Sequence, residues 1–109
     1  MVTQIPKRLL NQNAKIKLYN GNGGSGPVYL SEIDLKHIRV EKHDVIKRGL
    51  EGQEVIGKAL MFYDIVNSQG LSEEPRQNSI VTFEDKEYRV VEVDTLYATK
   101  KHHYEIILK

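Results

Sequence analysis

Apolar and polar residues alternate with a period of two over much of the second half of the chain. The alternation covers residues 79–83 and 88–93, which flank the polar segment 84–87, and it returns at 104–109. Alternation of this kind places the apolar side chains on one face of a β-strand. Two such runs around a short polar turn are typical of a β-hairpin. We therefore predict a hairpin followed by a C-terminal strand.

The first half of the chain continues the β pattern. Residues 15–19 alternate, and a longer extended segment begins at 28 and runs to 40. The apolar positions change parity between Leu35 and Ile38, so we predict a β-bulge or bend there. Residues 59–66 are almost continuously apolar and rich in β-branched and aromatic types, which favours a central strand buried on both faces.

Only residues 6–10 suggest a helix, as one short N-terminal turn. About six strands separated by short turns predict an all-β fold, a small antiparallel β-barrel with long loops. The 109 residues suffice for a single domain, 1–109.

Three connecting segments are unusually long or glycine-rich. Residues 20–27 predict a flexible Gly-rich loop, and residues 67–78 form a polar segment with Gly70 and Pro75. Residues 41–58 predict a long Gly-containing loop, and long loops in small domains are usually functional or disordered.

Composition narrows the function classes. The chain has no cysteine, which excludes disulfides and thiolate metal sites, and it has no apolar run long enough to span a membrane. We expect it to be made in the cytosol. Net charge is +1, but residues 1–58 hold ten Lys and Arg against six Asp and Glu, whereas residues 59–109 hold six against nine. This asymmetry fits either chance variation or a two-faced protein that stacks basic side to acidic side.

No catalytic constellation stands out. The Gly-rich loop ends at Pro27 and leads into a strand, so it lacks the Lys-Ser/Thr and the helix of a phosphate-binding loop. No serine lies in a Gly-x-Ser-x-Gly elbow. His102 and His103 are neighbours that should face opposite ways on extended backbone, and His37 and His43 flank a polar stretch. We therefore expect no enzyme activity, no metal site and no cofactor.

The stretch 36–48 carries five Lys and Arg against two acids. It fits either contact with a polyanion such as DNA or an exposed strand edge kept soluble by charge. A DNA contact here would be electrostatic and independent of sequence.

Three stretches taken together carry a family resemblance. They are residues 5–10, residues 59–64 with 66–68, and residues 83–88 with Val91, Val93, 96–97 and 102–105. Their order and spacing, which cover nearly the whole chain, resemble those of the minor capsid proteins encoded in the head-morphogenesis clusters of tailed bacteriophages and prophages of Gram-positive hosts.

The resemblance implies a head-completion or stopper-like protein of the head–tail connector. Such a protein would be a monomer in isolation and a homo-oligomeric ring in the virion, below the portal and adaptor proteins. It would close the DNA channel, touch packaged double-stranded DNA non-specifically and dock the tail. No enzymatic activity, cofactor or membrane contact is implied, and the expected location is the head–tail interface of a virion assembled in the host cytoplasm.

Two sets of candidate residues follow as hypotheses. The candidate channel or gate loop comprises Lys42, His43, Lys47, Arg48, Gly49, Gly52 and Gly57. The candidate assembly contacts are Lys7, Arg8, Tyr97, His102 and His103. The alternative function is a small OB-like or SH3-like nucleic-acid-binding module, which would bind DNA as an isolated domain with strong salt dependence.

Overall fold

The computed structural model describes residues 6–97 and 99–109. Ile5, where the first of the three family-like stretches begins, lies outside the described residues. The described chain contains one 3-10 turn, η1 (Lys7–Leu9), which matches the helical turn predicted at 6–10. Its strands are β1 (Gln12–Lys17), β2 (Tyr19–Gly23), β3 (Gly26–Tyr29), β4 (Ile33–Gly49), β5 (Gly52–Asp64), β6 (Ile80–Phe83), β7 (Lys86–Tyr97) and β8 (Lys101–Leu108).

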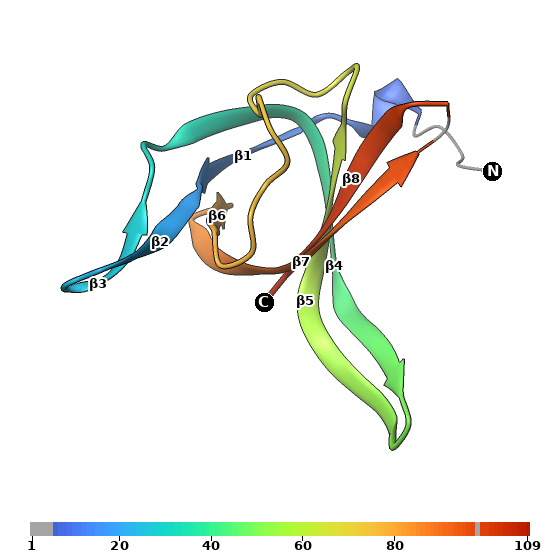
Figure 1. Cartoon of the computed structure of the whole chain (residues 1–109). Coiled ribbons are helices and arrows are strands. Elements are labelled where there is room, and N and C mark those ends of the chain that lie inside the picture. Colours follow the sequence, from blue (N-terminus) through green and yellow to red (C-terminus); the bar gives the residue numbers. More distant parts are fainter. Residues whose placement is uncertain (1–5, 98) are drawn as a thin grey trace.

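Six of the strands form an antiparallel sheet that closes on itself (Figure 1). Their order is β1-β4-β5-β8-β7-β6, and β6 returns to β1 through the pair Lys15 and Thr82. The predicted hairpin is β6 with β7, and the C-terminal strand is held between β5 and β7. The all-β fold class is therefore confirmed.

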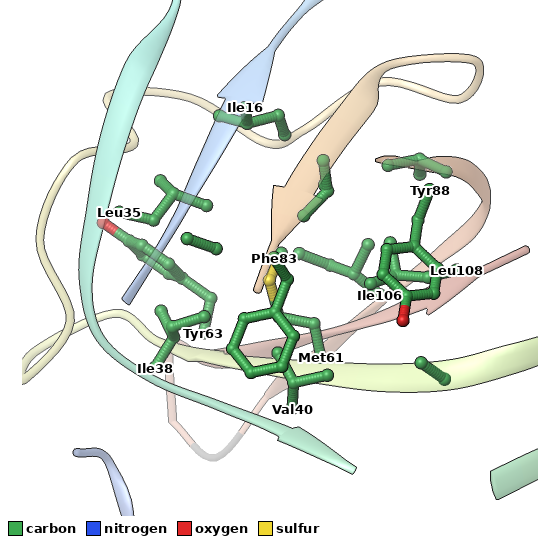
Figure 2. Close-up of a cluster of buried hydrophobic side chains, with 14 of the residues drawn as sticks. Ile16, Leu35, Ile38, Val40, Met61, Tyr63, Phe83, Tyr88, Ile106 and Leu108 are labelled. Carbon is green, nitrogen blue, oxygen red and sulfur yellow. The ribbon is translucent and has the colours of Figure 1, made fainter. Parts of the chain in front are cut away.

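The core lies inside this closed sheet and comes from the inward positions of the alternating pattern (Figure 2). Tyr104, Ile106 and Leu108 all point inward from β8, as the C-terminal alternation predicts. In β5 the inward residues are buried, but Leu60 and Phe62 on the outer face are only partly covered. The prediction of a strand buried on both faces is thus wrong for these outer positions, because little of the chain packs over that side.

The predicted irregularity between Leu35 and Ile38 is confirmed as a bulge. Gln12 pairs with Ile38 and Ala14 with Leu35, so two residues of β4 stand opposite one residue of β1. His37 within the bulge has a positive φ of 57°. The extra residue restores the inward direction of the apolar side chains after the parity change.

Residues 41–58 are not a loop, which corrects the prediction from the sequence. They form the distal part of a long hairpin in which β4 and β5 remain paired from Arg39 and Phe62 to Gly49 and Gly52. This hairpin extends away from the closed sheet (green to yellow-green in Figure 1). Bulges after Lys42 interrupt the register and break the alternation that would have indicated strands in the sequence.

Residues 20–27 also belong to a hairpin, formed by β2 and β3, which projects from another side of the closed sheet (Figure 1). Residues 67–78 do form an irregular connection. It is fixed to the bulge in β4, because Lys36 and Gln69 exchange two backbone hydrogen bonds of 3.0 Å.

Candidate functional site

The most prominent feature outside the core is the distal hairpin of residues 41–58, which we call the arm. In the closed sheet β4 pairs with β1 only up to Ile38, and β5 pairs with β8 only from Ala59 onward. Beyond these points, strand pairing among the described residues is between β4 and β5 alone. A two-stranded ribbon is marginally stable in water by itself, and its free edges are available for pairing with another chain.

Gly57 sets the position of the arm at its base. A Cβ atom at this residue would lie 2.5 Å from Cγ2 of Ile107 and 2.8 Å from the carbonyl oxygen of Leu108. The arm backbone therefore passes directly over β8, and only glycine fits there. This close approach buries Ile107 although its side chain lies outside the main core.

A groove of about 300 Å³ opens beside the arm's base. Its apolar floor and its charged rim are contributed by the arm and by the outer faces of β5, β7 and β8. The floor comprises Val45, Ile46, Ile56, Leu60 and Ile107, and the rim comprises Lys47, Glu92, Asp94 and Glu105.

Most of the cationic side chains of the arm form ion pairs with carboxylates. Lys42 is bonded to Glu84, a hydrogen bond that raises the pKa of the Lys42 ammonium group.

Farther along the arm, the ammonium nitrogen of Lys58 lies 3.2 Å from a carboxylate oxygen of Asp44, and that of Lys47 lies 3.8 Å from Glu92. Arg48 has no ion pair within residues 6–97 and 99–109. It is thus the arm's cation most available to an outside partner.

The remaining gate candidates have different surroundings. His43 is half-exposed and lies 3.7 Å from Glu41, measured from Nε2 to the carboxylate oxygen. Gly52 has a φ of +117° and supplies the left-handed conformation that the turn at the tip requires. Gly49 precedes that turn, and its position is open to a larger residue.

Apolar side chains on the arm were missed by sequence reasoning. Ile46 and Val55 are directly paired across the arm and both are exposed, and Leu50 at the tip is fully exposed. The sequence feature that could have revealed them is the placement of two aliphatic pairs, Val45-Ile46 and Val55-Ile56, on either side of Gly49 and Gly52. Exposed apolar residues gathered on a projecting element are typical of a protein interaction surface.

The candidate contacts His102 and His103 lie together, which corrects the prediction that they face opposite ways. Their Nδ1 atoms are 2.7 Å apart, and Nε2 of His103 lies 3.0 Å from a carboxylate oxygen of Glu105. A register shift after Leu96 on the paired strand marks irregular backbone here. His103 is buried, so within this chain it supports the strand end rather than offering a surface.

Tyr97, the next candidate contact, is exposed at the end of β7. Ile65 and Val66, in the turn after β5, are exposed as well, and the amide of Ile65 donates to the carbonyl of His102. Lys7 and Arg8 are exposed on η1. No hydrogen bond between the described residues joins these two side chains to the β7–β8 end.

A hollow of about 420 Å³ lies beside this end of the sheet. Tyr63 and Tyr104 belong to the core but border this hollow, and they stack with ring centroids 6.0 Å apart. Burial raises the pKa of both phenols, and the charge of Glu74 adds to the effect on Tyr104. Ser72, Lys101, Glu73 and Glu74 also line the hollow, but among the residues described the two carboxylates bond to Arg76 and Thr95 and not to Ser72 or Lys101.

Across the described part of the chain, no three His, Asp or Glu side chains gather in the way that a metal ion needs. The same residues include no helix of the length and hydropathy needed to cross a bilayer.

Comparison with known proteins gives one match. A family model described as "Minor capsid protein" matches residues 6–108. No curated protein and no solved structure matches the chain.

Proposed function

The chain belongs to the minor capsid protein family, a structural component of phage particles, and from this premise we propose that it is a ring-forming protein of the head–tail connector. In this role it sits below the portal and adaptor proteins, closes the DNA channel after packaging and presents a face to the tail. The role requires binding surfaces rather than reactive groups, so we propose that the protein is not an enzyme.

The observation that carries this proposal is the arm. A closed sheet leaves no free strand edges, whereas the arm adds two free edges and exposes Ile46, Leu50 and Val55. A protein that acted alone would gain nothing from this ribbon, which costs solubility and has little stability of its own. In a ring the ribbon can pack against a neighbour or reach into the central channel.

Within the proposal, the arm replaces the mobile loop as the channel-facing element. Of the predicted gate residues Lys42, Lys47 and Arg48, Arg48 is the one open to DNA phosphate or to a carboxylate of a neighbouring copy, because Lys42 and Lys47 lie beside carboxylates. One cation per subunit supports weak, non-specific contact. Because the lysines of the arm are paired with carboxylates, the case for a nucleic-acid-binding module is weaker, since such a module needs several unpaired cations on one face.

Tail or adaptor docking is assigned to the β7–β8 end. Tyr97, Ile65 and Val66 are exposed there, and His102 is partly exposed beside them. An aromatic residue with adjacent aliphatic side chains is a common anchor in protein interfaces. Lys7 and Arg8 on η1 are proposed as further contacts.

The experiment is to shorten the arm in a phage that carries this gene. Replacing residues 44–57 by Asn-Gly joins β4 and β5 by a two-residue turn next to the pair Lys42 and Ala59, which is the geometry of a type I′ hairpin. We expect a folded chain, filled heads that lose DNA and few attached tails. Thermal unfolding checks the fold, and nuclease protection with electron microscopy measures DNA retention and tail attachment.

The matched control shortens the other projecting hairpin. Replacing residues 20–28 by Asn-Gly leaves the pair Tyr19 and Tyr29 at the new turn. This variant should retain DNA in a larger fraction of heads than the arm variant. Full, tailed and infectious particles from the arm variant would contradict the assignment of the arm to the channel.

A further inference from the structure

We infer that the arm's partner is a second copy of this chain: Leu50 and Arg48 at the tip of one arm occupy the groove at the base of the next copy's arm. This inference rests on the proposed function and deepens it, because it names the contact that would build the ring: the arm packs against a neighbouring copy, and Arg48 meets a carboxylate of that copy rather than DNA phosphate.

The tip has the shape and chemistry of an inserting element. Leu50 is fully exposed at a turn only two residues long, between the paired Gly49 and Gly52. Arg48 is exposed beside it and has no ion pair within residues 6–97 and 99–109. The tip therefore presents one aliphatic side chain next to one free positive charge.

The groove offers the complementary chemistry. Val45, Ile56 and Leu60 are part of its apolar floor, and its volume of about 300 Å³ lies at the small end of the range for protein pockets, enough for one aliphatic side chain and its neighbours. Asp94 on its rim is exposed and, within the described residues, has no ion pair. An arginine beside an inserting leucine can pair with such a carboxylate.

Among the described residues, the rim carries more negative than positive charge. Its carboxylates are those of Glu92, Asp94 and Glu105, and its ammonium group, that of Lys47, lies 3.8 Å from Glu92. The charge match therefore lies between Arg48 of the tip and this acidic rim, with Asp94 as its partner. Such complementarity fixes the orientation of partners.

A chain cannot make this contact with itself. The groove lies along the base of the same hairpin whose far end carries Leu50, and the paired strands hold the tip away from it (Figure 1). A tip and a groove on different surfaces make a heterologous contact, which generates a closed ring when the rotation between copies permits it. The contact would also cover Leu50 and Ile46, two of the arm's exposed apolar residues.

The test uses the absence of native cysteine. Glu51→Cys with Glu92→Cys places one thiol on the tip and one on the groove rim while keeping Leu50, Arg48 and Asp94, and a short bis-maleimide is applied to particles that contain this double variant. We expect a ladder on denaturing gels that extends beyond dimers. The control, Glu51→Cys with Lys17→Cys, carries two exposed thiols but places the second on β1, on the opposite side of the closed sheet. It should give at least tenfold less material above the dimer.

A charge exchange adds a second readout, in chains that carry the same Glu51→Cys and Glu92→Cys pair and so keep Arg48 and Asp94 available for exchange. Arg48→Glu should reduce the ladder severalfold, and adding Asp94→Arg should restore it. The inference would be overturned by a ladder no stronger than the control's. It would also be overturned if adding Asp94→Arg to Arg48→Glu failed to restore the ladder. If the chain is at the head–tail junction while the ladder is absent, the inference fails and the proposed function stands. If the ladder forms but the chain lies elsewhere in the particle, the inferred contact stands and the proposed head–tail role fails.

Discussion

Substituting Gly57 by alanine tests whether the arm is fixed in place at its base. The new Cβ would lie 2.5 Å from Cγ2 of Ile107 and 2.8 Å from the carbonyl oxygen of Leu108. The Ile107 methyl group can rotate away, but Leu108 O belongs to the backbone of a strand paired on both sides. The arm must therefore move away from β8.

The expected cost follows from two opposing effects. Forcing one extra carbon into a packed site typically costs about 1–3 kcal/mol. Removing a glycine from a strand returns about 0.5–1 kcal/mol, because the unfolded chain loses conformational freedom. The net effect is a loss of up to about 2.5 kcal/mol in the free energy of unfolding, centred on about 1 kcal/mol. Each 1 kcal/mol lowers Tm by about 4–8 °C in a domain of this size.

Urea denaturation and thermal melting of the purified chain measure this effect, and hydrogen exchange of the arm amides shows where it acts. Gly49→Ala is the matched control, because the nearest atom to its Cβ would be Gly52 O at 3.9 Å. The control should be neutral or slightly stabilising. Equal stability of the two variants, or unchanged exchange of the arm in Gly57→Ala, would refute the close approach of the arm to β8.

Three further changes give separable results. Asp64→Ala should lower the free energy of unfolding by about 1–3 kcal/mol in urea denaturation, because the buried Asp64 carboxylate accepts 2.9 Å hydrogen bonds from the amides of Val66 and Asn67. Asp64→Asn keeps one acceptor oxygen and should cost less. Equal losses for the two variants would contradict this role of the carboxylate. The raised pKa of Tyr104 means that the folded chain holds this proton to higher pH than the unfolded chain, so stability should fall as pH rises above about 10. Tyr104→Phe should make that alkaline loss shallower, and an unchanged slope would argue against the burial of the phenol. Leu50→Ser should change the unfolding free energy of the isolated chain by no more than about 0.5 kcal/mol, because Leu50 is fully exposed. It should reduce severalfold the amount of this chain in purified particles, as measured by quantitative blotting. Normal incorporation would show that the tip makes no essential contact.

The sequence predicts those features that depend on local alternation. The inward side chains of β8 and the bulge at Leu35 to Ile38 both follow from parity, because a residue's face in a strand is set by its position along the strand. The His102 and His103 contact could not be predicted in this way. It depends on a register shift in the pairing of β7 with β8, which involves residues distant in sequence.

The arm shows the same limit more clearly. Three glycines within residues 41–58 indicated a loop, yet Gly52 serves a turn and Gly57 serves a close approach to β8. The partners of the cations also come from distant strands, since Lys42 meets Glu84 and Lys47 meets Glu92. Sequence reasoning thus located the candidate segment but could not predict that it is a folded, mostly charge-paired hairpin.

Electron cryomicroscopy of the intact particle tests the central claim most directly. The account predicts density for this chain as a ring at the head–tail junction, with residues 41–58 ordered and in contact with a neighbouring copy or the channel. Density for the chain on the outer shell of the head, or a ring whose arms extend into solvent without contacts, would contradict it.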